Sequence, residues 1–241
     1  MARQVRSEAT RQKIMDAAID VFSEIGYAAG GWSTIIERTG MTKGALYHHF
    51  DSKESLASAI IDEGSDTLLV AFQNVCGSSS PALENMIHGT FTIANLLSSD
   101  KMAHAAEQLT AALSGFNEAA ARFCAGLVEL MAAQAARASA EGDLRAGLDP
   151  VVVGESIVGA VLGTRLLSSA LSSNGLNGST AVGGYVDLTG RAGQLWELLL
   201  AGIAADASLP YFRQFLAREA LRHAQSATPP PRAIVAVSEA N

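Results

Sequence analysis

A nine-residue stretch in the first quarter of the chain carries residue types that bind anions. It reads Thr42-Lys43-Gly44-Ala45-Leu46-Tyr47-His48-His49-Phe50. A threonine that starts a helix accepts a hydrogen bond from a free backbone N–H, and the other free N–H groups and the helix dipole favour a phosphate nearby. Lys43 adds a full positive charge there. The stretch therefore predicts a short helix, capped by Thr42, whose first turn meets an anion, and duplex DNA is the anion that we expect.

The two sides of this short helix differ in chemistry. Gly44 lets the backbone approach a groove floor or a thymine methyl, at a cost of about 1 kcal/mol in helix propensity. Ala45 keeps the turn slim, and Leu46 and Phe50, four residues apart, can anchor the helix in a core. The outer faces carry ring side chains, at Tyr47, His48 and His49. Each of these residues alone is more often structural or solvated, but together they predict a helix that reads DNA.

The residues before this stretch complete a two-helix unit. Trp32, Ile35 and Ile36 have helical spacing and predict a helix over residues 32–39, which Gly40 would end. Trp32 is expected to pack against the rest of the unit. A helix, a turn of about three or four residues with a glycine, and a second helix form a helix-turn-helix. The second helix of such a unit lies in the major groove of DNA.

One further helix is expected before the unit, over residues 7–25, capped by Ser7 or Thr10 and ended by Gly26. Its apolar face repeats at helical spacing. The residues of this face are Ile14, Ala17, Ala18, Val21, Phe22 and Ile25.

The charge of the chain is divided unevenly. The net charge is −7, but residues 1–53 hold seven Lys and Arg against six Asp and Glu, whereas residues 54–241 hold ten against eighteen. The amino end is locally basic, with Arg3, Arg6, Arg11 and Lys13 against Glu8 alone. We expect Arg3 and Arg6 to contact phosphate or the minor groove, although a solvated tail has the same composition.

Four blocks of residues resemble the DNA-binding domain of the TetR family of transcriptional repressors. They are Gly26-Tyr27, Ser33-x-Ile35, Gly40-Met41-Thr42-Lys43-Gly44-Ala45-Leu46-Tyr47-x-His49-Phe50 and Lys53-Glu54-x-Leu56. The opening Met1-Ala2-Arg3-Gln4 and the run from Thr42 to Phe50 are most similar to the γ-butyrolactone autoregulator receptors of actinobacteria. The resemblance covers roughly residues 5 to 60 and implies DNA contacts by Ser33 and Lys53. At Gly30-Gly31 the family usually has Thr or Ser, so one hydroxyl expected at phosphate is missing here.

The rest of the chain predicts an all-α fold. A fourth helix capped by Ser52 should run to about Val75. Its tilt would set the distance between the two DNA-reading helices of a dimer, residues 43–49 of each copy, which we call the reader. Further helices are expected over residues 81–98, 101–114, 117–141, 150–172, 187–206 and 209–225. We therefore expect a helix-turn-helix domain over residues 1–52, a helical ligand-binding and dimerisation domain over 53–226, and a disordered tail over 227–241. The Ser/Gly/Asn segment from Ser172 to Gly184 is either a loop near the pocket or inert.

The larger domain offers mostly apolar side chains for an interior, which suits a lipophilic effector such as a lactone, a fatty acyl compound or a drug. The candidate effector-binding residues are Met86, Phe91, Met102, Leu109, Leu113, Phe116, Phe123, Leu127, Met131 and Arg165. Each could equally be core, and His88 or His104 could also line such a pocket. In butyrolactone receptors a tryptophan contacts the ligand in the region that matches residues 116–131, and this chain has none there.

Residues 151–171 are nearly long and apolar enough to cross a membrane, but Glu155 and Arg165 lie inside this stretch. A charge near the bilayer centre costs about 2.5–3.5 kcal/mol, so we expect a buried helix and no membrane partner. Small residues on it, Gly154, Gly159, Ala160 and Gly163, permit close approach of another helix. The resemblance implies a homodimer through helices 150–172 and 187–206. Two recognition helices would also read a palindrome, which one alone reads too briefly.

Other functions have little support in the sequence. There is no Gly-rich phosphate loop, no His-x-x-x-His or Cys-x-x-Cys and no Gly-x-Ser-x-Gly motif, so we expect no enzyme activity, no cofactor and no metal ion. Cys76 and Cys124 are expected to be free thiols. The polar start does not resemble a signal peptide, which favours a cytoplasmic, nucleoid-associated protein.

The sequence thus predicts a homodimeric repressor that binds a palindromic double-stranded DNA operator and is released by a small lipophilic effector. A γ-butyrolactone-like compound is one candidate, but without the tryptophan the resemblance does not by itself imply it. A transcriptional activator would use the same reader. An effector-binding protein with a vestigial reader and an all-helical enzyme acting on a lipophilic substrate are the alternatives from other classes.

Overall fold

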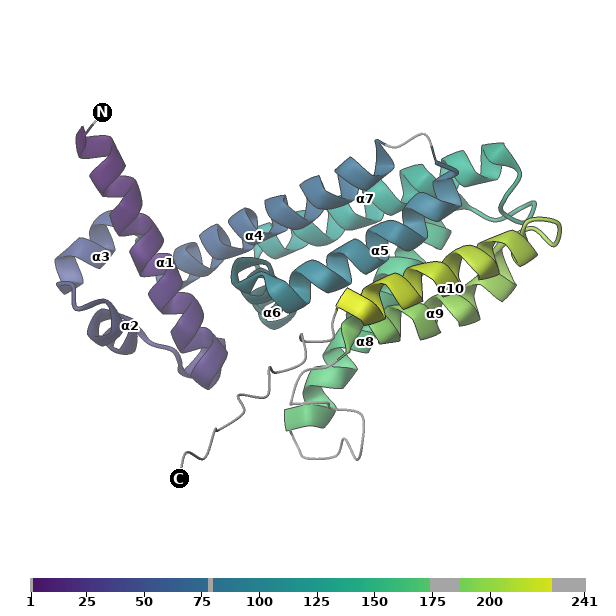
Figure 1. Cartoon of the computed structure of the whole chain (residues 1–241). Coiled ribbons are helices and arrows are strands. Elements are labelled where there is room, and N and C mark those ends of the chain that lie inside the picture. The colour runs from purple at the N-terminus through teal and green to yellow at the C-terminus, as the bar shows by residue number, and fades with distance from the viewer. Residues whose placement is uncertain (1, 78–79, 174–186, 227–241) are drawn as a thin grey trace, which may run out of the picture.

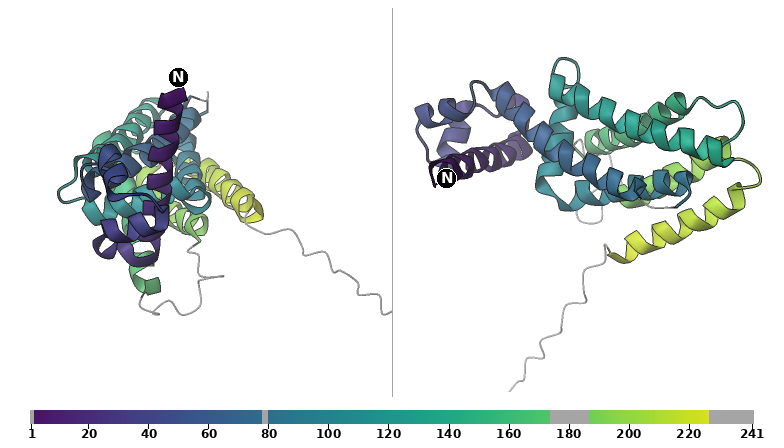
Figure 2. Two further views of the ribbon diagram at one scale, coloured as in Figure 1. Left: turned by 90° about the vertical axis from the view of Figure 1, so that its left-hand side faces the viewer. Right: turned by 90° about the horizontal axis from the view of Figure 1, so that it is seen from above.

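The chain folds as helices over the residues that the computed structural model describes, which are 2–77, 80–173 and 187–226. A small N-terminal lobe lies at one end of an elongated helical body, and α4 runs from the lobe into the body (Figures 1 and 2). The lobe contains α1 (Ala2–Ala29), α2 (Trp32–Thr39) and α3 (Lys43–His49). The body contains α4 (Lys53–Cys76), α5 (Ala82–Ser99), α6 (Lys101–Leu113), α7 (Glu118–Glu141), α8 (Pro150–Ser173), α9 (Leu188–Ile203) and α10 (Leu209–Ser226). This all-α architecture, with a helix-turn-helix lobe, confirms the expected fold class.

The core of the lobe forms where the apolar face of α1 meets the inner sides of α2 and α3. Ile14, Ala18 and Phe22 of α1 are buried in the same cluster as Ile35 of α2 and Leu46 of α3. Burying an aliphatic or aromatic side chain of this size stabilises a fold by about 1.5–3 kcal/mol. The lobe is therefore held by a few large side chains, which leave the outer face of α3 in solvent.

The expected limits of α1 were wrong at the amino end. The helix begins at Ala2 rather than residue 7, because nothing in residues 2–6 breaks a helix, and Thr10 donates a hydrogen bond to the Arg6 carbonyl (2.9 Å) instead of capping. Gly26 interrupts the helix as expected, with a left-handed φ of 79°. Ile25 is 49% exposed, so the buried face ends at Phe22.

The two glycines before α2 have a packing reason. A Cβ at Gly30 would lie 2.8 Å from the Phe22 ring, so a larger residue cannot fit there without moving the core. Gly31 is the N-cap residue of α2 and provides no side-chain hydrogen bond. The hydroxyl that relatives are expected to have at this helix start is thus replaced by a close contact with α1. Gly40 then ends α2 in the left-handed conformation, with φ 66°.

The remaining helix limits lie within three residues of those expected from the sequence. The largest difference is at the end of α9, which stops at Ile203. Ala204 leaves the helix because it pairs with Leu144 in an isolated β-bridge. The Ser/Gly/Asn segment beyond residue 173 and the tail over 227–241 lie outside the described residues.

The helix α6 packs very closely on α4. A Cβ at Gly64 of α4 would lie 2.5 Å from the Ala106 Cβ and 2.6 Å from the Met102 carbonyl oxygen, so only glycine fits between these backbones. Met102 and Ala106 both belong to α6. The same helix contacts the lobe, because Lys101 Nζ lies 2.5 Å from Asp20 Oδ1 of α1. Thus α6 touches both the helix that leaves the lobe and the lobe itself.

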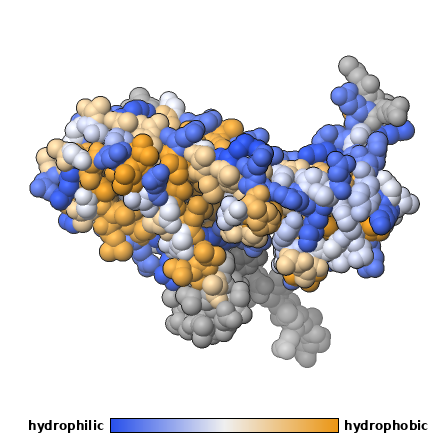
Figure 3. All heavy atoms as spheres, turned by 180° about the vertical axis from the view of Figure 1, so that it is seen from behind, coloured by the Kyte–Doolittle hydropathy of each residue, from blue (hydrophilic) through white to orange (hydrophobic). Residues whose placement is uncertain are grey.

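Part of the body surface is strongly apolar, whereas the lobe is mainly hydrophilic in the view from behind (Figure 3). The described residues contain one helical window, Pro150–Leu167 of α8, that is long and apolar enough to span a membrane, and 28% of it is buried. Arg165 lies inside this window with its side chain 10% exposed and paired to Glu107. The window also carries exposed large apolar side chains, which are Val151, Val152, Leu166 and Leu167. Leu198 on α9 is exposed as well.

Candidate nucleic-acid interface and internal cavity

The helix α3 is fixed by its inner side and its first turn. Thr42 Oγ1 accepts a hydrogen bond from the Ala45 N–H (3.3 Å), as the sequence predicts. Leu46 is fully buried and Phe50 is 5% exposed, so both anchors lie in the core. The Arg11 guanidinium of α1 lies 5.4 Å from the centre of the Phe50 ring, which adds a cation–π contact across the lobe.

The outer side of α3 presents a cation, a phenol and two imidazoles to solvent. Lys43 Nζ lies 5.6 Å from the centre of the Tyr47 ring. Tyr47 is 42% exposed, and the centre of its ring lies 5.5 Å from the centre of the Trp32 ring. This contact confirms that Trp32 supports α3 by packing. A Cβ at Gly44 would meet nothing within 4 Å, so the backbone is open to an approaching surface there. The His48 and His49 rings contact each other edge to face at 5.3 Å.

Lys53 has a structural partner that the sequence did not reveal. Its ammonium donates to the Tyr27 carbonyl (2.8 Å) and to the Ala28 carbonyl (3.4 Å), and lies 4.3 Å from the centre of the Tyr27 ring. Lys53 therefore fastens the start of α4 to the end of α1, and two of its three donors are occupied. Its first role in the fold is to set the angle between lobe and body.

The other predicted DNA contacts are less fully defined. Ser33, on α2, and Arg6, on α1, are exposed. Arg6 sits on a helix rather than on a flexible arm, because α1 extends to Ala2. The Arg3 side chain lies outside the described residues.

Inside the body lies an apolar cavity of about 50 Å³ between α4, α5, α6, α7 and α8. Its lining residues are Leu68, Phe72, Thr90, Ile93, Leu97, Glu107, Phe123, Leu127, Met131, Ile157, Val158, Val161, Leu162 and Arg165. The walls are almost entirely hydrocarbon, and the polar groups are confined to Thr90, Glu107 and Arg165. A cavity with apolar walls and a few convergent polar groups is the usual form of a small-molecule site. At this size a drug-sized ligand requires the walls to move apart.

A buried ion pair forms the polar part of the cavity. Arg165 Nε donates to Glu107 Oε2 at 3.0 Å, with the two side chains 10% and 7% exposed. Arg165 Nη2 lies 2.9 Å from His104 Nδ1. Because a guanidinium can only donate, Nδ1 accepts and the proton of the neutral ring is on Nε2. Nδ1 also lies 3.1 Å from the Leu97 carbonyl, to which the ring donates only in the other tautomer, with the proton on Nδ1.

The protonation of His104 follows from its surroundings. Burial, and then the positive charge of Arg165, lower the pKa of His104 below its usual value. The neutral ring is the form that can accept from Arg165. His104 thus holds the guanidinium in place beside the cavity, whereas His88 lies elsewhere, at the contact between α5 and α10.

Four of the ten predicted effector-binding residues line the cavity, namely Phe123, Leu127, Met131 and Arg165. The other six lie away from it. Met86, Phe91, Leu109 and Leu113 are buried elsewhere in the core, and Met102 is half-buried with its carbonyl against Gly64. Phe116 was wrongly placed inside, because it falls in the turn after α6 and is 67% exposed. Trp196 of α9 is fully buried and does not line the cavity.

The sequence reading missed most of the α8 wall. One side of this helix lines the cavity with Ile157, Val158, Val161, Leu162 and Arg165. A single arginine on an apolar helical face requires a buried partner, and that requirement could have identified both the face and Glu107. The contributions of Leu68, Phe72, Thr90, Ile93 and Leu97 depend on how the helices pack, which no local pattern specifies.

The helix α6 connects the cavity with the lobe. Glu107 faces the cavity, the adjacent Ala106 contacts Gly64 of α4, and Lys101 pairs with Asp20 of α1. Two wall residues, Leu68 and Phe72, also belong to α4 itself. A change in the cavity walls therefore has a short mechanical path to the lobe.

Comparisons with known proteins agree with this geometry. Residues 14–60 match the family model of bacterial regulatory proteins of the tetR family. The chain is 32% identical to the A-factor receptor protein of Streptomyces griseus over 204 residues. This match covers 85% of this chain and 67% of that protein.

Solved structures give the same result. The crystal structure of a γ-butyrolactone receptor (ArpA-like protein) superposes with a TM-score of 0.70 at 25% identity, covering 90% of this chain and 99% of that one. CprB from Streptomyces coelicolor, solved in complex with its biological operator sequence, has a TM-score of 0.70 at 26% identity and the same coverage.

Proposed function

This chain belongs to the TetR family of transcriptional regulators and is related to the γ-butyrolactone receptors, and on that premise we propose that it is an effector-released repressor. It binds a palindromic operator on the cytoplasmic nucleoid as a homodimer. Residues 1–52 form the DNA-binding domain and residues 53–226 bind the effector and dimerise. The observation that carries this proposal is α3, anchored by Leu46 on one side with its outer face open.

The proposed DNA contacts divide into two kinds. Thr42, Lys43, Gly44 and Ala45 meet base edges or the adjacent phosphate in the major groove, because they lie on the open first turn of α3. The groups that hold the backbone and fix register are Tyr47, His48, His49, Ser33, Arg3 and Arg6. Lys53 positions the lobe and has one donor left for a phosphate.

Replacement of Lys43 by alanine tests the reader. We expect operator affinity to fall about tenfold, roughly 1.4 kcal/mol, and the slope of log affinity against log salt to decrease by about 1, because one cation leaves the phosphate surface. Fluorescence anisotropy with DNA from the protein's own promoter region, at several salt concentrations, measures both. Arg213→Ala removes an equal charge from an exposed position on α10 and should change neither. Equal losses in the two variants would contradict the assignment.

Dimerisation is supported by the uncovered apolar residues of α8 and α9. Leu166, Leu167 and Leu198 are 60%, 63% and 77% exposed in the single chain. Gly154 packs against Ala132 of α7 within the chain, but a Cβ at Gly159 or Gly163 would meet nothing within 4 Å. These positions leave space for a helix from a second copy. We assign the interface to a four-helix contact of residues 150–172 and 187–206, which also keeps the apolar α8 away from water.

Leu198→Asp tests this interface. A carboxylate at the centre of an apolar contact must be desolvated, so we expect the dimer dissociation constant to rise at least about tenfold, with operator binding lost in parallel. Analytical ultracentrifugation over a concentration series gives the constant. Leu221→Asp places the same charge on α10, at a residue 63% exposed, and should leave the dimer intact. A dimer of unchanged strength in Leu198→Asp would remove α9 from the interface.

The effector acts through the cavity. Its apolar walls suit a hydrocarbon chain, and the Arg165 guanidinium suits a carbonyl or lactone oxygen at one end. To fit, the ligand moves α6 and α4 as one unit away from α7 and α8, which tilts the lobe through the Gly64 and Lys101 contacts. The ligand must bind this released conformer more tightly, and a tenfold loss of operator affinity needs about 1.4 kcal/mol of coupling.

Filling the cavity separates effector binding from DNA binding. Val161→Phe adds a ring to the wall, so we expect normal operator binding but no release by an acyl γ-butyrolactone. Anisotropy with increasing lactone measures the release. Leu221→Phe, which places the same ring on the surface of α10, should respond like the unaltered protein. Release that persists in Val161→Phe would place the effector elsewhere.

Three results would favour a different function. Failure of the unaltered dimer to bind DNA from its own promoter region would indicate an effector-binding protein with a vestigial reader. A lactone recovered chemically altered after incubation would indicate an enzyme. Reduced rather than increased transcription on deletion would indicate an activator. If the lactone has no effect but the operator is bound, mass spectrometry of small molecules that co-purify with the dimer identifies the effector class.

A further inference from the structure

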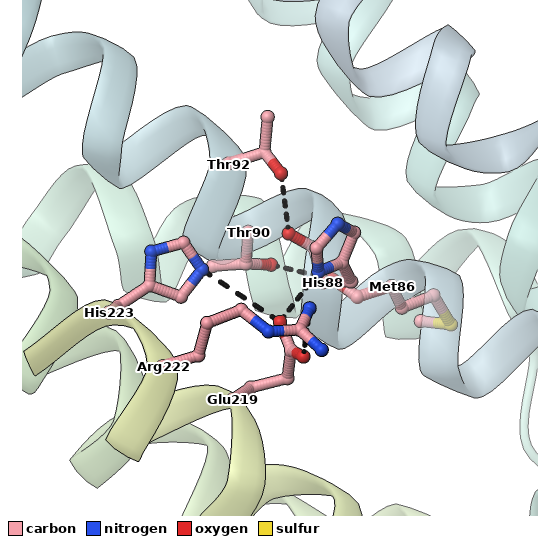
Figure 4. Close-up of polar contacts among 7 residues, drawn as sticks. All are labelled: Met86, His88, Thr90, Thr92, Glu219, Arg222 and His223. Atoms are coloured by element: carbon pink, nitrogen blue, oxygen red, sulfur yellow. Dashed lines mark hydrogen bonds and ion pairs between the residues drawn. The ribbon is translucent and has the colours of Figure 1, made fainter. Parts of the chain in front are cut away.

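Three potential metal-binding side chains meet where α10 crosses α5, apart from the reader and the effector cavity (Figure 4). His88 comes from α5, and Glu219 and His223 come from α10, one helical turn apart. Their ligand atoms, one from each residue, all lie within 4.8 Å of one another. The Glu219 side chain is 2% exposed, that of His223 is 14% exposed and that of His88 is 35% exposed.

Both imidazoles converge on the same carboxylate oxygen. His88 Nδ1 lies 2.6 Å and His223 Nε2 lies 3.8 Å from Glu219 Oε2. The other oxygen, Oε1, is occupied by Arg222 Nη1 at 2.8 Å. The Phe91 ring stacks on His223 at 5.2 Å, with 17° between the ring planes, and this fixes the direction of the imidazole. The three ligand atoms are thus held by contacts that leave Oε2 and His223 Nε2 facing one another.

One of these ligand atoms lacks a hydrogen-bond partner. His223 Nε2 is buried and has no hydrogen-bond partner among the described residues. A buried polar atom without a partner costs about 1–3 kcal/mol, so such atoms usually have a role. An ion pair between a protonated His88 and Glu219 would satisfy those two residues but leave His223 Nε2 unpaired. An ion bound between the three atoms satisfies all of them.

We propose that His88, Glu219 and His223 bind a divalent transition-metal ion, with Zn²⁺ as the best match. Neutral imidazole nitrogen and carboxylate oxygen are standard zinc ligands, and two histidines with one carboxylate leave a fourth position for water. Ligand atoms in a tetrahedral zinc site are about 3.3 Å apart, as follows from metal–ligand distances near 2.0–2.2 Å. The observed 2.6 and 3.8 Å lie on either side of this value and the two imidazole nitrogens lie within 4.8 Å of each other, so side-chain rotations are needed to complete the site.

The surroundings fit an occupied site. Arg222 binds the oxygen that the ion does not use, as a second group commonly does at a metal-bound carboxylate. A hollow open to solvent lies beside the site, with His88, Glu84 and Glu219 in its lining, and gives the ion a path from solvent. Where His88 Nδ1 carries a proton, binding releases that proton to water.

The ion would join α10 to α5. The following residues of α5, Thr90, Ile93 and Leu97, line the effector cavity. The bound ion would therefore stiffen the cavity wall that α5 forms. Two imidazoles and a carboxylate from helices far apart in sequence are then connected at one point. The consequence that can be measured is metal-dependent stability of the body.

The full-length dimer, stripped with a chelator and dialysed, is titrated with Zn²⁺ by calorimetry, and with Co²⁺ by visible absorption. We expect one ion per chain, a tetrahedral Co²⁺ spectrum and a higher melting temperature with Zn²⁺. His88→Ala should weaken binding by at least about 100-fold, because it removes a ligand rather than a supporting group. His88 is partly exposed, so this variant should fold, and circular dichroism checks that it does. His223→Gln should have the same effect on binding.

A control variant tests whether the two adjacent imidazoles of α3 bind the ion instead. His48→Asn combined with His49→Asn removes the histidine pair on α3 and should leave the stoichiometry and affinity of zinc binding unchanged. No zinc binding by the unaltered dimer, or equal binding by His88→Ala, would overturn the proposal. Loss of the ion in the His48/His49 double variant would do the same, because it would place the metal on the reader.

Discussion

The contact that the proposed function depends on is the close packing of α6 on α4 at Gly64. A Cβ there would come within 2.6 Å of the Met102 carbonyl, so the two backbones touch without side chains between them. Close-packed interfaces do not deform gradually but move as units. The helix α4 leaves the lobe at Ser52 and is fastened to it by Lys53 on the Tyr27 carbonyl. Any displacement of α6 is therefore passed to the lobe with little loss.

The turn of α6 that contacts Gly64 also carries a charged group of the cavity wall. Glu107 is buried and paired with Arg165 across the cavity. Leaving one partner of such a pair alone costs about 3–5 kcal/mol, so a ligand that competes for Arg165 must also move Glu107. Ala106 is the next residue, which places the ion pair and the Gly64 contact on the same turn. The metal-binding cluster lies on α5 and α10, behind the cavity, where an ion would limit how far the wall moves.

The reader could be predicted from sequence and the cavity largely could not, for physical reasons. Thr42, Gly40 and Ser52 act within a few residues of themselves, so local chemistry specified the caps and helix limits. Leu46 and Phe50 likewise share one helical face. By contrast, the cavity combines five helices, and residues such as Leu68 and Val161 meet only after packing. His88 and Glu219 are 131 positions apart, and Lys53 bonds a carbonyl 26 positions earlier, so no short motif contained either contact.

In the proposed mechanism, the cavity controls the distance between the two recognition helices of a dimer. Pulsed electron spin resonance on a dimer labelled at Ser23→Cys, an exposed lobe position on α1 outside the proposed DNA contacts, with Cys76 and Cys124 replaced by alanine, measures the distance between lobes directly. With operator bound, we expect a narrow distribution consistent with recognition helices about 34–36 Å apart. With effector, the distribution should shift by several ångströms or broaden. An identical distribution in both states, although the effector releases DNA, would contradict the account.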